Sequence, residues 1–213
     1  MSEPGKNQET DNRTEYEKRF REKVMAPDSV SIRQFQSAVE GAIKARSKVT
    51  YLVWKELKEQ YPEVDATKVM ASAYEKFGEL TGETWGDIEN PGQALIAQSS
   101  MGGYLVFDQT LKECSETYAQ KTFHHCPHIE AFRELGATDE EIKVLCQDIL
   151  SAGDYGNMNP HDKVRLEFRK QIGAGMTHAS IVWYHVKMPE NVLSNKFAQI
   201  TKGCRYNGNL YRE

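Results

Sequence analysis

The spacing of apolar residues changes near the middle of the chain, and this change constrains the fold more than any other feature. Before about residue 115, apolar side chains recur every three or four positions, as on one face of a helix. Beyond that point, several segments alternate apolar with polar residues or are rich in β-branched and aromatic types, as strands are. We therefore expect an α+β fold: a helical N-terminal half packed on a small antiparallel sheet of about three strands, with intervening helices.

The first helical segment follows a polar and charged stretch and is expected to start at a cap on Asp28 or Ser29. Its apolar positions include Val49, Leu52 and Val53, which recur at helical spacing. The segment should end near 61–62, where a proline follows a tyrosine, as one long helix or two short ones.

Two further helical segments complete the first half. One should run from about 66 to 80, with Asp65 as its N-cap and Gly82 just after it. The other should cover about 93–114 and be broken or loosened at Gly102 and its neighbour Gly103.

The second half is expected to hold three strands and two helices. The strands are predicted within 116–125, at about 164–169 and at 179–187. Between the first two strands, a short helix at 128–135 should be followed by one that opens with a capping box at Thr138. The order is therefore strand-helix-helix-strand-strand.

This pattern predicts one α+β domain over residues 28–213 after a flexible N-terminal arm at 1–27. Within the domain, 28–115 should be mainly helical and 116–190 should carry the sheet. The helical half is also where we expect the chain to form a homo-oligomer.

Composition narrows the classes of function. No apolar run is long enough for a membrane span and no secretory signal is present, so a cytoplasmic protein without membrane contact is expected. The 4 Cys show no CxxC spacing, which argues against a zinc ribbon or a disulfide framework. A net charge of -4 without a basic cluster argues against nucleic acid as a partner. The expected partner is a small-molecule substrate.

The segment 123–128 is the densest group of chemically versatile side chains. It holds His124, His125, Cys126 and His128, and imidazole and thiol groups bind transition metals or perform acid-base and nucleophilic steps near neutral pH. If the segment is a strand that ends at Pro127, His124 and Cys126 share one face and His125 lies on the other. The alternative is a strand end with partly exposed histidines and a small buried cysteine.

Cys146 and Asp148 form a second candidate pair in the middle of the capped helix. Residues two apart on a regular helix point in nearly opposite directions, so the two should enter one pocket only if the helix is distorted. Cys146 is equally well explained as a core residue, and Asp148 as a solvated one.

Two polar turns offer further candidates. The segment 154–161 is expected to be a polar loop after this helix, in which Tyr155 and Asn157 either bind substrate or serve the turn. His178 precedes the last strand and would line a pocket beside His125 or Cys126 if those strands are neighbours.

The order of these motifs resembles the L-2-amino-thiazoline-4-carboxylic acid hydrolase family. The resemblance covers about residues 116–187 and rests on the Phe-His-His-Cys-Pro, Leu-Cys-Gln-Asp and Leu-Glu-Phe segments and the closing glycine-rich turn. Cys126, Cys146 and Asp148 fall on matching positions. Where the family pattern commonly has a cysteine after the last turn, this chain has His178.

The resemblance implies a hydrolase, or a lyase, that acts on a small heterocyclic or carboxylated substrate such as a cyclic amidine, cleaving a C–N bond. Together with the residue types above, this gives His125, Cys126, Cys146, Asp148 and His178 as candidate catalytic residues, and His124, His128, Tyr155 and Asn157 as candidate substrate-binding residues. A thiolate could attack the C=N carbon, or a divalent transition metal held by His125, Cys126, His128 and His178 could activate water. A non-enzymatic small-molecule or metal-sensing module is the alternative.

Overall fold

The computed structural model describes residues 14–24, 29–170 and 179–186. Contacts between Cα atoms divide the chain into two compact units, residues 1–35 and residues 36–213. In the first unit, α1 (Glu15–Val24) lies in the predicted arm and begins with a capping box. There Thr14 Oγ1 accepts a hydrogen bond from the Glu17 backbone N–H, and Glu17 caps the Thr14 N–H in return. The flexibility of the arm stays a prediction.

The second unit contains the helical half expected from the sequence. Its helices, in chain order, are α2 (Ile32–Gln60), which begins before the unit boundary, α3 (Ala66–Gly82), the 3-10 turn η1 (Glu83–Trp85), α4 (Pro91–Gln98) and α5 (Met101–Val106). The long α2 begins at Ile32 rather than near Asp28, because Ser31 and Gln34 form a reciprocal cap there. Asp65 caps α3 as predicted.

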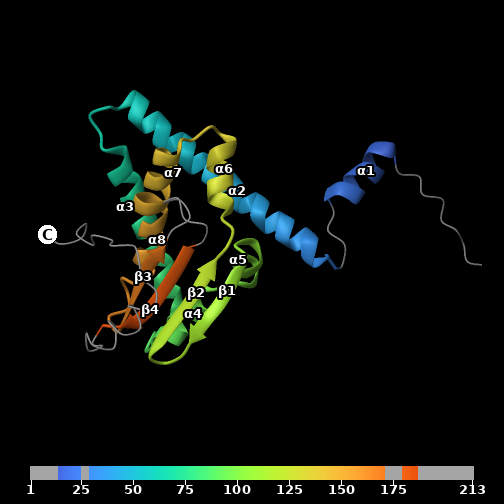
Figure 1. Ribbon diagram of the computed structural model, residues 1–213. Coiled ribbons are helices and arrows are strands. Elements are labelled where there is room, and N and C mark those ends of the chain that lie inside the picture. The colour runs from blue at the N-terminus through green and yellow to red at the C-terminus, as the bar shows by residue number, and fades with distance from the viewer. Residues whose placement is uncertain (1–13, 25–28, 171–178, 187–213) are drawn as a thin grey trace, which may run out of the picture. The chain divides into compact units, whose positions relative to one another are not determined.

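The sheet has four described strands in the order β1-β2-β4-β3, each antiparallel to its neighbour (Figure 1). They are β1 (Gln109–Cys114), β2 (Tyr118–Phe123), β3 (Val164–Lys170) and β4 (Ala179–His185). Between β2 and β3 lie α6 (Pro127–Glu134), α7 (Asp139–Val144), the π-helical segment η2 (Leu145–Leu150) and α8 (Ser151–Gly156). The α+β class and the helical N-terminal half are confirmed.

The prediction of a helical segment over 93–114 was wrong for its last residues, which form a strand. The helix stops at Gln98, α5 starts after Ser100, and β1 takes the remainder. The strand was missed because β1 is an edge strand whose residues are half-buried or exposed, with Leu111 half exposed, so its sequence lacks the alternation that marks a strand. Its pairing with β2 is a long-range contact that local spacing does not encode.

The buried face of α2 also differs from the expected one. Val49, Leu52 and Val53 are 61%, 50% and 42% exposed, whereas Tyr51 and Trp54 are buried. Tyr51 and Trp54 have large aromatic side chains, and each also satisfies its polar group. The Tyr51 hydroxyl donates a hydrogen bond to Glu141, and the Trp54 indole N–H donates one to Thr67.

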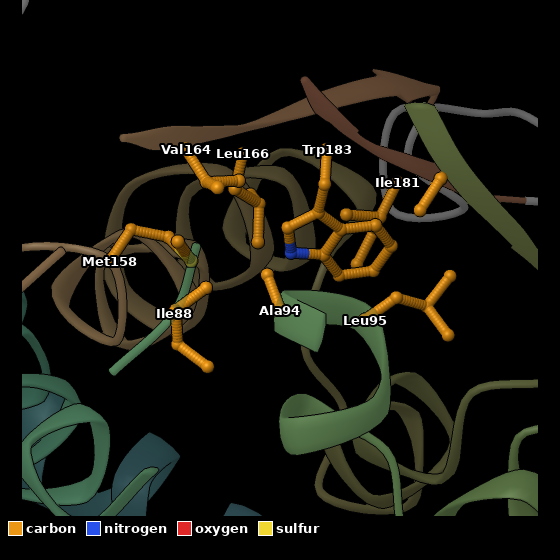
Figure 2. Packing of buried hydrophobic residues seen from close by; sticks show 9 residues of the cluster. Ile88, Ala94, Leu95, Met158, Val164, Leu166, Ile181 and Trp183 are labelled. Atoms are coloured by element: carbon orange, nitrogen blue, oxygen red, sulfur yellow. The ribbon is translucent and has the colours of Figure 1, made fainter. Parts of the chain in front are cut away.

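Two cores support the unit. The sheet core joins β2, β3 and β4 to α4, and Figure 2 shows Trp183 of β4 extending toward Ala94 and Leu95. The helical core joins α2, α3, α6, α7 and η2, with Phe132 and Leu145 fully buried. Two clusters rather than one leave room for a site lined from both.

Glycines allow α3 and α8 to approach closely. A Cβ added at Gly78 would collide with the carbonyl oxygen of Gly153, and one at Gly82 with that of Asn157. Because α8 carries polar side chains that face the interior, this close contact fixes where those side chains lie.

Candidate functional site

A cavity of about 430 Å³ is lined by side chains from both cores. Two sets of its residues matter for chemistry. The charged set is Arg46, Lys121 and Asp154, and the Cys/His set is His125, Cys126, His128 and Cys146.

Lys121 brings an amine to the cavity from the middle of β2. Its residue is only 4% exposed, and its Nζ lies 3.0 Å from Ser99 Oγ. The rings of Phe123 and Trp183 are each 5.4 Å from the same nitrogen, a distance at which ring faces attract a cation. Burial lowers the pKa of Lys121 to about 8, and the charge of Asp154 opposes that shift.

Asp154 brings the opposite charge from α8. Its Oδ1 accepts a hydrogen bond of 2.9 Å from Gln98 Nε2 at the end of α4. Burial raises the pKa of the Asp154 carboxyl to about 6, while the charges of Lys121 and Arg46 act to lower it. The Asp154 carboxyl and the buried Lys121 amine therefore influence each other through their charges, and their pKa values lie on either side of neutral pH.

The Cys/His set is placed by the link between β2 and α6. The strand ends at Phe123, and Cys126 is the N-cap of α6, with Pro127 at its first position. His125 and Cys126 consequently both line the cavity, whereas the strand geometry predicted them on opposite faces. That expectation assumed a strand that runs to Pro127, whereas β2 ends at Phe123, two residues before His125. His124 does not line the cavity and lies 3.0 Å from Thr110 Oγ1.

The thiols of this set are held in their neutral form. Burial raises the pKa of Cys126 to about 11, against hydrogen bonds from the backbone of Ile129 and His128 that favour the thiolate. Burial also raises the pKa of Cys146, and proximity to Cys126 adds to the rise. Neither pKa is lowered as a nucleophilic cysteine requires.

The two imidazoles are engaged by the fold. Burial lowers the pKa of His128 to about 3, and its Nδ1 lies 2.6 Å from Ser47 Oγ. His125 Nδ1 lies 2.6 Å from the Val106 carbonyl oxygen and its Nε2 2.8 Å from Glu130 Oε1. For His125, burial lowers the pKa, but these two hydrogen bonds together outweigh it and leave the pKa raised.

The metal site expected from His125, Cys126, His128 and His178 is only partly described. Among the described residues, the one group with suitable ligand geometry is Glu40, His125 and Glu130, whose ligand atoms lie within 4.8 Å of one another. The Lys44 ammonium lies 2.6 Å from Glu130 and 3.1 Å from Glu40, so a cation of the protein already pairs with both carboxylates. Metal binding stays a prediction.

The remaining predicted residues fall in different places. Asn157 lines the cavity. Asp148 lies in the π-helical segment with Cys146, so the helix is distorted, yet only Cys146 lines the cavity. Tyr155 packs edge-on against Phe168 in the sheet core. His178 lies outside the described residues.

Sequence reasoning missed Arg46, Lys121 and Asp154. The polar loop predicted at 154–161 was wrong at its start, because Asp154 belongs to α8. A signal for Lys121 was present: alternation places it on the same strand face as Ala119 and Phe123, where a lysine is unusual. Nothing in the local sequence indicates that α8 brings a carboxylate to that lysine.

Comparison with known proteins gives three findings. No curated protein matches this chain. A solved trafficking protein particle complex subunit 3 from Naegleria fowleri, covalently bound to palmitic acid, is 11% identical with a TM-score of 0.41, over 68% of this chain and 97% of that chain. Likeness at that level carries no argument about this protein.

None of the helices in the described ranges is long and apolar enough to cross a membrane.

The third finding concerns the family. A family model described as L-2-amino-thiazoline-4-carboxylic acid hydrolase matches residues 42–179, which include α2 from its middle onward, the intervening helices and the first three strands. The match spans the charged set and the Cys/His set and covers more than half of the chain. The chain therefore belongs to the L-2-amino-thiazoline-4-carboxylic acid hydrolase family.

Proposed function

We propose that this protein is a hydrolase that opens the ring of a small, carboxylated cyclic amidine bound in the cavity. The observation that carries the proposal is that Lys121 and Asp154 line the same cavity, because hydrolysis of an amidine needs both a base and an acid at one site. Family membership supports the choice of substrate class.

The charges around the cavity favour a substrate that carries a carboxylate. Arg46 and Lys121 contribute two positive charges and Asp154 one negative charge, so the described lining has an excess of one positive charge when both imidazoles are neutral. A substrate carboxylate would neutralise that excess. Of the three charged residues, Arg46 is the exposed one, so its guanidinium can contact an anion that enters from solvent.

The proposed reaction adds one water across the ring C–N bond. The Asp154 carboxylate accepts a proton from water as its oxygen attacks the amidine carbon, and the Lys121 ammonium donates a proton to the departing ring nitrogen. A C–O bond forms and the C–N bond breaks. Transfer of the proton from Asp154 to Lys121 then restores both groups, and their pKa values of about 6 and about 8 favour that direction of transfer.

The raised thiol pKa values favour attack by water over attack by a thiolate. Cys126 and Cys146 are protonated at neutral pH, so direct attack would first require removal of a proton from a buried thiol. In this proposal the two cysteines shape the cavity beside the reacting ring, and His125 and His128 hold the link and α6 in place through their hydrogen bonds.

The test is hydrolysis of L-2-amino-thiazoline-4-carboxylate by the purified full-length chain, followed as a product heavier than the substrate by one water. The wild type should open the ring, and Asp154→Asn should lose about 10²- to 10⁴-fold in rate. Asp162→Asn changes an exposed aspartate outside the cavity and should keep the wild-type rate. Binding without conversion by the wild type would contradict the proposal and favour a ligand-sensing module.

A further inference from the structure

Two buried amide oxygens lack a hydrogen-bond partner among the described residues. They are Oε1 of Gln98 and Oε1 of Gln109, and both side chains line the cavity. A buried carbonyl oxygen without a donor is costly, and such groups are uncommon in folded proteins. Both residues belong to the cavity lining, so a molecule bound there would lie next to their side chains.

The orientation of both amides is set by their NH₂ groups. Gln98 Nε2 donates to Asp154 Oδ1 at 2.9 Å, and Gln109 Nε2 donates to the Gly103 carbonyl oxygen at 3.2 Å. Rotating either amide by half a turn would bring its oxygen against another oxygen. Each side chain therefore presents an acceptor, and not a donor, as its remaining polar atom.

The backbone supports these positions from two elements. Gln98 is the last residue of α4, which packs on the sheet core through Ala94 and Leu95. Gln109 is the first residue of β1 and follows Asp108, which has a φ of 46° in the left-handed region. A non-glycine residue with such a φ stores strain, which is common next to binding sites.

We propose that Gln98 and Gln109 determine specificity by accepting hydrogen bonds from the N–H groups on the amino-substituted carbon of the ligand. The inference rests on the proposed function, because that function identifies the cavity as the substrate site. An amidine carries several N–H donors there, whereas a ligand with a methyl group in place of the amino group carries none. Such a ligand would leave both buried oxygens unpaired, which is how protein sites reject an analogue that lacks a donor.

The experiment uses two aromatic probes, 2-aminothiazole-4-carboxylate and 2-methylthiazole-4-carboxylate, which match in size and charge and whose rings resist hydrolysis. Calorimetric titration of the wild type should show the amino probe binding at least about tenfold more tightly than the methyl probe. Gln109→Met should reduce this preference to about threefold or less. Gln98→Met should do the same, and Gln93→Met, an exposed glutamine of the same helix, should keep the full preference.

Two outcomes would overturn the inference. One is equal binding of the two probes by the wild type, which would mean that water satisfies the two oxygens. The other is a preference that survives both Gln98→Met and Gln109→Met in folded protein, as checked by circular dichroism. Since neither probe is converted, these results are independent of turnover: a donor preference without ring opening of the thiazoline would contradict only the proposed function, and ring opening without the preference only this inference.

Discussion

The charged set and the Cys/His set line the same cavity, but burial has different consequences for their protonation near neutral pH. Lys121 and Asp154 oppose each other's shift, so their pKa values stay within reach of neutral pH, at about 8 and about 6. Among the residues that the structure describes, the charge that acts on the Cys126 thiol is that of Glu130, which adds to the effect of burial. Burial therefore leaves the first set able to exchange protons and the second set neutral.

The comparison shows that a dense local motif and a reactive site need not coincide. The cluster at 124–128 stands out in the sequence, yet its imidazoles bond to the Val106 carbonyl, Glu130 and Ser47 and its thiol is neutral. Asp154 is unremarkable in the sequence, and Lys121 is marked only by its place on the apolar face of β2; the two line one cavity because β2 and α8 both contribute to it. Each of the following changes tests one side of this contrast.

The largest effect is expected for Lys121→Met. Loss of the ammonium removes the acid for the departing nitrogen, so kcat/KM for ring opening should fall by about 10²- to 10⁴-fold. Lys112→Met alters an exposed lysine of β1 and should leave the rate unchanged. Activity of folded Lys121→Met within a few-fold of wild type would remove the charged set from the chemistry.

Gly78→Ala tests whether the packing of α3 on α8 positions Asp154. The added methyl group would collide with the Gly153 backbone, so we expect a loss of about 1–3 kcal/mol in the free energy of unfolding. Gly41→Ala adds the same group on α2 where nothing lies within 4 Å, and should stabilise the helix by about 0.5–1 kcal/mol. Urea unfolding of both variants measures the two free energies of unfolding. Equal changes in the two variants would show that α8 moves aside from the added methyl group at little cost.

His128 tests the neutral character of the Cys/His set. An unfolded histidine takes up a proton below its usual pKa of 6.5, whereas folded His128 stays neutral down to about 3. Stability should therefore fall as the pH is lowered, and at about pH 5 the His128 contribution to the loss is about 2 kcal/mol. His128→Gln should lose correspondingly less stability than the wild type between neutral and mildly acidic pH. A protein whose acid sensitivity is the same with and without His128 would show that the folded imidazole accepts a proton.

The smallest effect is expected for Cys126→Ala. A neutral thiol that only shapes the cavity can be removed with a change of less than about tenfold in kcat/KM, far below the effect of losing a reacting group. A loss comparable to that of Asp154→Asn would instead assign the attack to the thiol. Cys114→Ala, at an exposed cysteine outside the cavity, provides the control.

Local signals predicted those parts of the fold that depend on neighbouring residues. The capping box at Thr138, the Asp65 cap and the strands β2, β3 and β4 lie where spacing and end signals placed them. The edge strand β1 was missed because its stability comes from pairing with β2. The site depends still more on distant contacts: Gln98, Lys121 and Asp154 come from three elements, and no spacing rule joins them.

The dependence of kcat/KM on pH tests the assignment of chemistry to the charged set most directly. Asp154 must be deprotonated to accept a proton and Lys121 protonated to donate one, so activity should rise through about pH 6 and fall through about pH 8. Lys121→Met should abolish the alkaline limb in any residual activity. A rate that keeps climbing above pH 8 toward the Cys126 pKa of about 11 would show that a thiolate performs the reaction and would contradict this account.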